Sequence, residues 1–181
     1  MKKINEIFYS IQGEGFHTGT PAIFVRFSGC NLACSFCDTA HQSGILMSDH
    51  EIVAEIEKYP AKHVVLTGGE PGLFLTAELI NLIKSKGKYI QVETNGTKEL
   101  PANIDWITCS PKAGGALNVK GINELKVVYL NQEMSQYDAI PTDVRFLQPC
   151  SGENTDEVIE YLKANPQWRL SLQTHKILNV R

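Results

Sequence analysis

Residues 30–37 read Cys30-Asn31-Leu32-Ala33-Cys34-Ser35-Phe36-Cys37. The cysteines follow a C-x3-C-x2-C spacing, and the apolar stretch 22–27 before them is typical of a strand, so we expect one short loop. Three thiolates on such a loop can converge on a single metal centre. An iron–sulfur cube has four iron corners, and four cysteines usually fill them in protein sites. Three cysteines therefore predict a [4Fe-4S] cluster with one iron free for another ligand.

Structural zinc is the alternative for this loop. His41 follows soon after Cys37, and a Cys3His set would complete the tetrahedral site that zinc prefers. Zinc loops usually take their cysteines from two separated knuckles, and no second knuckle is found in this sequence. Cys109 and Cys150 stand apart, and we interpret both as small buried or half-buried thiols.

The composition describes an ordinary globular protein. The 181 residues are 43% hydrophobic and 20% charged, with a formal net charge of −3. The length suits one compact domain, so we predict a single domain over residues 1–181. Nucleic-acid binding normally leaves a basic footprint, and a membrane span needs roughly 20 apolar residues. We therefore expect a cytoplasmic protein with no nucleic-acid or membrane partner.

Strands and helices alternate along the chain. Helices are predicted after the capping box at 48–51, over 76–86 before Gly87, and over 155–164. The predicted strands are 22–27, 63–67, 89–93, 104–108, 125–129, 144–147 and 170–172. This pattern indicates an α/β fold with a largely parallel sheet. A closed barrel takes about 250 residues, so we predict a partial, open TIM-like βα barrel with shortened helices.

Distinctive residues gather where the predicted strands end. The cysteine loop follows the predicted strand 22–27. The next three predicted strands are followed by Gly68-Gly69-Glu70-Pro71, Glu93-Thr94-Asn95-Gly96 and Ser110-Pro111-Lys112. Ligands bind at the carboxyl ends of the strands in such sheets, so we expect these residues to share one site. No catalytic dyad stands out, and we assign no acid–base residue.

The cysteine loop, with Phe36 before its last cysteine, resembles the signature of the radical S-adenosylmethionine (SAM) superfamily. The Gly68-Gly69-Glu70-Pro71 segment resembles that superfamily's GGE motif. The resemblance implies a shortened barrel of the radical SAM type, in which SAM binds the free iron through its amino and carboxylate groups. An electron from the cluster would cleave SAM and release a 5′-deoxyadenosyl radical, and the protein would supply orientation and shielding.

A narrower resemblance covers nearly the whole chain. It is carried by residues 7–15, 26–32, 37–39, 92–97, 110–112, 148–149 and 173–176. These segments are similar to those of the 7-carboxy-7-deazaguanine synthase family. Its members are lyases that contract the ring of 6-carboxy-5,6,7,8-tetrahydropterin and expel ammonia, on the route to queuosine and other 7-deazapurines. The resemblance implies that reaction here, with hydrogen abstraction at C6, a rearrangement steered by Mg2+, and regeneration of SAM.

The same resemblance assigns site residues position by position. Thr39 would bind Mg2+. SAM would contact Phe36, Cys37, Asp38, Gly69, Glu93, Ser110, Pro111, Lys112 and Gln148. The substrate would contact Ile11, Gln12, Gly13, Glu14, Arg26, Thr67, His175 and Arg181. The planar fork of Arg26 suits a carboxylate, and Glu14 suits the paired N–H donors of a pterin. The last residue is Arg181, where the family often has proline, and any last residue carries a free carboxylate.

Two other functions stay open on the sequence. A glycyl-radical-activating enzyme would also use SAM, although the polar segment 12–15 and Arg26 favour a small pterin substrate. A zinc-stabilised binding module would perform no catalysis, and metal analysis would distinguish it. The resemblance further implies flavodoxin or ferredoxin as electron donor, and we expect a homodimer that covers the apolar edges of a shortened barrel.

Overall fold

The computed structural model describes residues 1–37, 39, 41–112 and 115–181. One sheet contains nine strands in the order β3-β1-β2-β4-β5-β6-β7-β8-β9. The strands are β1 Lys2–Ile11, β2 Pro21–Phe27, β3 Ile45–Met47, β4 His63–Gly68, β5 Tyr89–Thr94, β6 Trp106–Cys109, β7 Glu124–Tyr129, β8 Val144–Pro149 and β9 Arg169–Leu170. The helices are α1 Asp49–Glu57, α2 Ala77–Ser85, α3 Thr155–Ala164 and the short α4 Thr174–Ile177.

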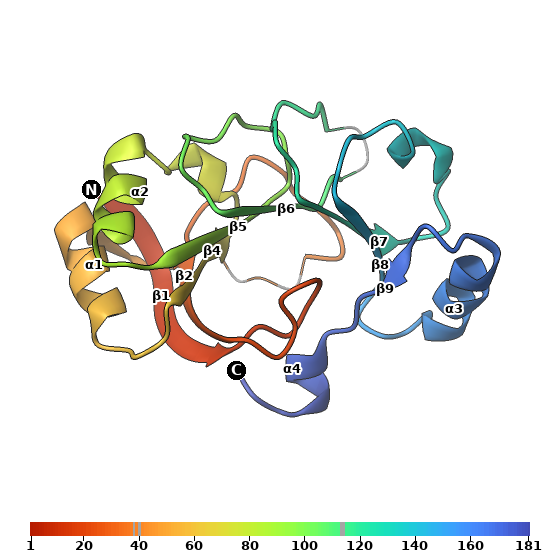
Figure 1. Cartoon of the computed structure of the whole chain (residues 1–181), viewed down its shortest axis with the longest axis horizontal. Coiled ribbons are helices and arrows are strands. Elements are labelled where there is room, and N and C mark those ends of the chain that lie inside the picture. The colour runs from red at the N-terminus through yellow and green to blue at the C-terminus, as the bar shows by residue number, and fades with distance from the viewer. Residues whose placement is uncertain (38, 40, 113–114) are drawn as a thin grey trace.

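The sheet curls into an arc that does not close (Figure 1). Neighbouring strands from β2 to β9 pair in parallel, while β1 pairs antiparallel with both β2 and β3. Helices α1, α2 and α3 lie on the convex side, and α4 and the C-terminus lie at the open side of the arc (Figure 1). This is the predicted partial βα barrel.

Short connections account for the small size of this barrel. Only turns and loops join β5 to β6 and β6 to β7 in the described residues, and a 3-10 turn at Ser135–Tyr137 lies between β7 and β8. The α-helices that do form have the predicted end signals. A complete capping box of Ser48 and Glu51 begins α1, Thr76 caps α2, and Gly87 follows α2 at φ +67°.

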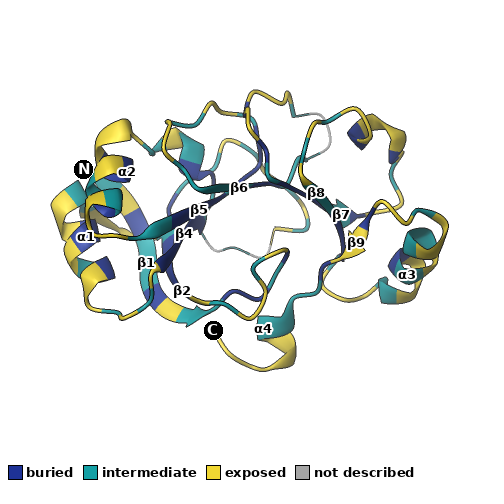
Figure 2. Ribbon diagram, in the orientation of Figure 1, coloured by how far each residue is buried: buried dark blue, intermediate teal, exposed yellow. Residues whose placement is uncertain are grey.

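The parallel strands place apolar and polar side chains on opposite faces, because successive side chains of a strand alternate. Val64 and Leu66 of β4 and Ile90 and Val92 of β5 pack against α1 and α2 in one buried cluster. A second cluster on the same face lies under α3. The alternate positions on the concave face include Arg26, Thr67, Glu93, Thr108, Lys126 and Gln148. Most strand residues are buried, while the outer sides of the helices are exposed (Figure 2).

The loop 12–20 closes the amino end of the arc. Phe16 stacks on Trp106, the first residue of β6, with ring centroids 4.7 Å apart. His17 packs edge-on against His63 at 4.7 Å, and burial together with His63 lowers the pKa of His17 to about 4. His17 is therefore uncharged at neutral pH, and its aromatic contacts pack the loop against the amino ends of β4 and β6.

Strands β1 and β3 were not predicted from the sequence. The pairing of β1 with β2 shifts register between Ile4 and Glu6, so its apolar residues do not alternate regularly. Strand β3 has three residues, two of them exposed, and it pairs only with β1. Both strands depend on distant pairing partners, which a local pattern does not reveal.

Removing a buried side chain from α2 should destabilise the fold. Ile80→Ala removes a fully buried side chain of the larger apolar cluster, and we expect the free energy of unfolding to fall by about 2–5 kcal/mol. Denaturant unfolding measures the change. The neighbouring exposed residue provides the control, since Asn81→Ala should change stability by no more than about 0.5 kcal/mol. Equal losses from both variants would contradict the assigned packing.

Candidate active site

Two adjoining cavities open on the concave face of the sheet. The first cavity, of about 190 Å3, lies at the cysteine loop and the carboxyl ends of the parallel strands. The second cavity, of about 360 Å3, is lined by β1, β2 and the C-terminal segment at the open side of the arc. Both cavities are lined by Glu14, Thr39, Thr67, Glu93 and Gln173. The two spaces therefore share a wall of polar side chains.

All three clustered cysteines line the first cavity as free thiols. Burial raises the pKa of Cys34, and Cys37 and Cys30 raise it further, so the three sulfurs lie close enough to interact. His41, the fourth ligand of the zinc hypothesis, lines the same cavity. Within the described residues, however, no three His, Cys, Asp or Glu side chains are grouped around one possible ion position.

The Gly68-Gly69-Glu70-Pro71 segment fixes the end of β5 beside the cysteine loop. The Glu70 carboxylate is fully buried and accepts hydrogen bonds from Thr94 Oγ1 and the Asn95 backbone N–H, both at 2.7 Å. Asn95 Nδ2 in turn donates to Asn31 Oδ1 at 3.2 Å. At Gly69 an added Cβ would lie 2.0 Å from the Gly29 carbonyl oxygen, so only glycine permits this approach.

Lys112 brings a positive charge to the first cavity. Its ammonium donates to Ser110 Oγ at 2.7 Å and lies 5.6 Å from the centre of the Phe36 ring. Burial lowers the pKa of Lys112, and the nearby Lys126 ammonium lowers it further. A half-buried cation next to an aromatic ring suits an anionic group such as a carboxylate.

Arg26 projects from β2 into the second cavity but does not offer a free fork. Its Nε donates to Glu6 Oε1 at 2.9 Å, and its NH1 lies 3.4 Å from Thr39 Oγ1. Glu6 also pairs with Arg181, whose guanidinium lies 4.9 Å from the Phe8 ring centre. Ser10 Oγ donates to an oxygen of the Arg181 terminal carboxylate. The chain end is thus fixed at the mouth of the second cavity.

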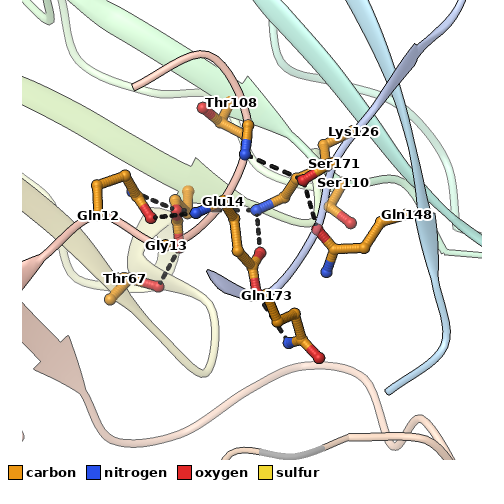
Figure 3. A network of polar contacts seen from close by, with 12 residues as sticks. Gln12, Gly13, Glu14, Thr67, Thr108, Ser110, Lys126, Gln148, Ser171 and Gln173 are labelled. Carbon is orange, nitrogen blue, oxygen red and sulfur yellow. Dashed lines mark hydrogen bonds and ion pairs between the residues drawn. The ribbon is translucent and has the colours of Figure 1, made fainter. Parts of the chain in front are cut away.

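A buried ion pair lies between the two cavities (Figure 3). Lys126 Nζ lies 2.5 Å from Glu14 Oε2 and 3.8 Å from Glu93 Oε1. Gln173 Nε2 donates to the other Glu14 oxygen at 2.8 Å. Burial raises the pKa of Glu14, but the Lys126 charge and the hydrogen bonds from Lys126 and Gln173 together outweigh burial, so this pKa lies below its usual value. The Glu14 carboxylate is therefore ionised at neutral pH.

The structure brings nearly all the predicted site residues to these cavities. The first cavity is lined by Cys30, Cys34, Phe36, Cys37, Thr39, Gly69, Glu93, Ser110, Lys112 and Gln148. The second cavity is lined by Ile11, Gln12, Gly13, Glu14, Arg26, Thr67, His175 and Arg181. Pro111 lines neither cavity. Asp38 lies outside the described residues.

Sequence analysis missed Lys126 and Glu6. Lys126 is a charged residue between the apolar Leu125 and Val127 of β7, and this position is a signal of an inward-facing charge. Glu6 gave no comparable signal, because acidic residues in an exposed-looking N-terminal segment are common. Its pairing with both Arg26 and Arg181 appears only in the fold.

An open βα barrel with three free cysteines at its mouth is the arrangement of a radical SAM protein. The profile of the radical SAM superfamily matches residues 24–165 of the chain. The 7-carboxy-7-deazaguanine synthase of Bacteroides thetaiotaomicron is 58% identical over 181 residues and covers all of both chains. That of Burkholderia multivorans is 40% identical, with 98% of each chain covered. The crystal structure of QueE from Escherichia coli matches with a TM-score of 0.80 and 33% identity, over 95% of this chain and 93% of that one. The chain belongs to the 7-carboxy-7-deazaguanine synthase family of this superfamily.

Membership of the superfamily implies SAM and a [4Fe-4S] cluster, and the first cavity fits both. Its three thiols match a cluster with one open iron, and its half-buried ammonium matches the carboxylate of SAM. No helix among the described residues is long and apolar enough to cross a membrane.

Iron content should depend on the loop cysteines alone. Cys34→Ala should reduce iron from about four per chain to a small fraction, because thiolates hold the cluster. Cys109→Ala is the control: Cys109 is fully buried and burial raises its pKa to about 12, so it has no thiolate to offer. Iron and sulfide analysis after anaerobic reconstitution measures both. One zinc per chain instead of iron would support the zinc hypothesis.

Proposed function

We propose that this protein converts 6-carboxy-5,6,7,8-tetrahydropterin to 7-carboxy-7-deazaguanine with loss of ammonia. The observation that carries the proposal is the pair of adjoining cavities with a shared polar wall. One contains the cysteine loop and Lys112, while the other contains Glu14, Arg26 and the chain end. A substrate in the second cavity would lie next to SAM in the first.

The second cavity offers complementary groups for the two ends of such a substrate. Arg26 and Lys176 supply positive charge for the pterin carboxylate, and the His175 ring lies in the same cavity. The ionised Glu14 would accept the paired N–H donors of the pterin ring, which resemble a guanidine. Gln12 Nε2 donates to Glu93 Oε1 at 3.0 Å and keeps this side of the cavity ordered.

Hydrogen abstraction depends on position rather than on a strong acid or base. When bound, the cluster and SAM supply a 5′-deoxyadenosyl radical that takes a hydrogen atom from C6 of the substrate. The chain's residues hold the substrate at the shared wall and exclude water from it. Thr39 lines both cavities, and its hydroxyl would contribute one ligand to a Mg2+ ion completed by waters and substrate oxygens.

A reductant is part of the proposal because the cluster must receive an electron. We expect flavodoxin or ferredoxin to supply it, and we expect the enzyme to work as a homodimer in the cytoplasm. A glycyl-radical-activating role is less well supported, because the charged second cavity suits a small polar molecule better than a peptide backbone.

An anaerobic assay tests the proposed reaction. The enzyme with its reconstituted cluster is mixed with SAM, dithionite, Mg2+ and 6-carboxytetrahydropterin, and products are followed by chromatography and mass. We expect 7-carboxy-7-deazaguanine and ammonia in equal amounts over many turnovers, without matching loss of SAM. Omission of Mg2+ should slow the reaction if Thr39 holds the ion. Slow release of 5′-deoxyadenosine with the pterin unchanged would contradict the proposed substrate.

The last residue should act through its carboxylate. Deletion of Arg181 moves the terminal carboxylate back by one residue to Val180, and it should raise the KM for the pterin by about tenfold or more, because a charged hydrogen-bond acceptor is displaced from the second cavity. Arg181→Met keeps the terminal carboxylate in place and loses the pairing with Glu6 and the contact with Phe8, so its KM should rise less. Steady-state kinetics with saturating SAM compare the two. An equal KM for the wild type and the deletion would exclude this role for the chain end.

A further inference from the structure

Among the described residues of the site, Lys126 has the largest number of charged neighbours. Neither the sequence pattern nor the family resemblance assigned a role to this residue. The Lys126 side chain is 7% exposed and comes from the middle of β7. It lies 2.5 Å from Glu14 of the 12–20 loop and 3.8 Å from Glu93 of β5. The ammonium thus joins three separate elements of the arc at the shared wall.

We infer that Lys126 is a positioning residue that holds Glu14 as an ionised carboxylate facing the second cavity. The inference rests on the proposed function, in which Glu14 accepts N–H donors of the substrate. Lys126 lines the first cavity and not the second, so it acts on a substrate in the second cavity through Glu14.

The charges around Glu14 leave Lys126 as its principal cation. The charged or titratable side chains around Glu14 are Lys126 and Glu124 of β7, Glu93 of β5, Lys112 after β6, and His175 of α4. Lys112 donates instead to Ser110. Glu93 adds negative charge and accepts from Thr67 Oγ1 at 3.0 Å. Without Lys126, Glu14 would lose its nearest cation while the Glu93 carboxylate remained close by.

Glu124 does not compete strongly for the ammonium. Its Oε2 accepts from the Phe16 backbone N–H at 3.2 Å and from Trp106 Nε1 at 3.1 Å, which anchors the 12–20 loop at the amino end. Burial raises the pKa of Glu124, while the Lys126 charge and the hydrogen bonds from Phe16 and Trp106 lower it. The Lys126 ammonium itself lies 2.5 Å from Glu14 and 3.8 Å from Glu93.

Loss of the Lys126 ammonium should change the shift in the Glu14 pKa from a lowering to a rise. With Lys126, Glu14 is ionised throughout the neutral range, because the ion pair lowers its pKa. In Lys126→Met, burial is left as the largest influence and raises that pKa. Glu14 should then bind a proton at low pH and regain its charge as pH rises. A protonated carboxyl accepts paired N–H donors poorly, so binding should weaken most at low pH.

The test compares the wild type, Lys126→Met, Glu14→Gln and the double variant as oxidised, SAM-bound holoenzymes without reductant. Anaerobic calorimetry gives the Kd of 6-carboxytetrahydropterin from pH 6 to 9. The ratio of the Lys126→Met Kd to the wild-type Kd should be about tenfold or more near pH 7 and should fall as pH rises.

The double variant isolates the route through Glu14. In the Glu14→Gln background, Lys126→Met should change Kd by less than about threefold and without pH dependence, since coupled residues are not additive. This comparison also serves if Lys126→Met alone fails to fold, because the double variant removes both members of the closest ion pair and leaves Glu93 with its hydrogen bonds from Gln12 and Thr67. A large additional loss in the double variant would overturn the inference.

A control variant and an NMR measurement made without substrate complete the experiment. Lys84→Met removes another lysine–carboxylate pair, with Asp105, outside both cavities, and it should leave Kd unchanged. Carbon-13 NMR of holoenzyme with labelled glutamate follows the Glu14 carboxyl group directly, and the Glu14→Gln variant assigns its signal. We expect Glu14 to be ionised at pH 6 in the wild type. In Lys126→Met we expect it to lose its proton at a higher pH than in the wild type. Identical Glu14 titration in both would overturn the inference. If the wild type neither binds nor converts the pterin, the proposed function fails, while this titration still decides the role of Lys126.

Discussion

The parallel strands of this sheet need apolar side chains on one face and polar side chains on the other, because one face packs against helices and the other lines a cavity. A closed barrel fills its interior with apolar layers, but this arc stays open and its concave face is polar. Thr67, Glu93 and Lys126 occupy that face, while their strand neighbours pack under the helices. Burying such groups is costly unless they are paired, so the polar contacts among them are a condition for the fold as well as for the site.

Two buried carboxylates illustrate how that condition is met. Glu14 is ionised and paired with Lys126, and this contact holds the 12–20 loop against β7. Glu70 instead accepts hydrogen bonds from the end of β5, and burial raises its pKa. Through Asn95 and Asn31 it connects β5 to the cysteine loop. Glu14 thus orders the wall between the two cavities, and Glu70 orders the end of β5 beside the cysteine loop.

The short chain completes its site with segments outside the parallel barrel. Strand β1 contributes Glu6, which orients Arg26 from β2. The C-terminal segment crosses the open side and brings Gln173 to Glu14 and Arg181 to Glu6. Because helices are absent between β5 and β7 in the described residues, these two terminal segments close the side that additional strand–helix units would cover in a full barrel.

The sequence by itself determined the features that depend on neighbouring residues. The spacing of Cys30, Cys34 and Cys37, the capping box at Ser48 and the alternation within β4 and β5 are local, and they sufficed for the open βα barrel and the position of the cluster loop. The family resemblance added most of the residues that line the two cavities. The tertiary structure alone decided the bulged pairing of β1, the attachment of Glu6 to Arg26, and the burial of Lys126 beside Glu14. These contacts join residues that are far apart in the chain, so a local sequence pattern does not reveal them. They are strong because water is excluded from them, and water is excluded only once the sheet has folded into its arc.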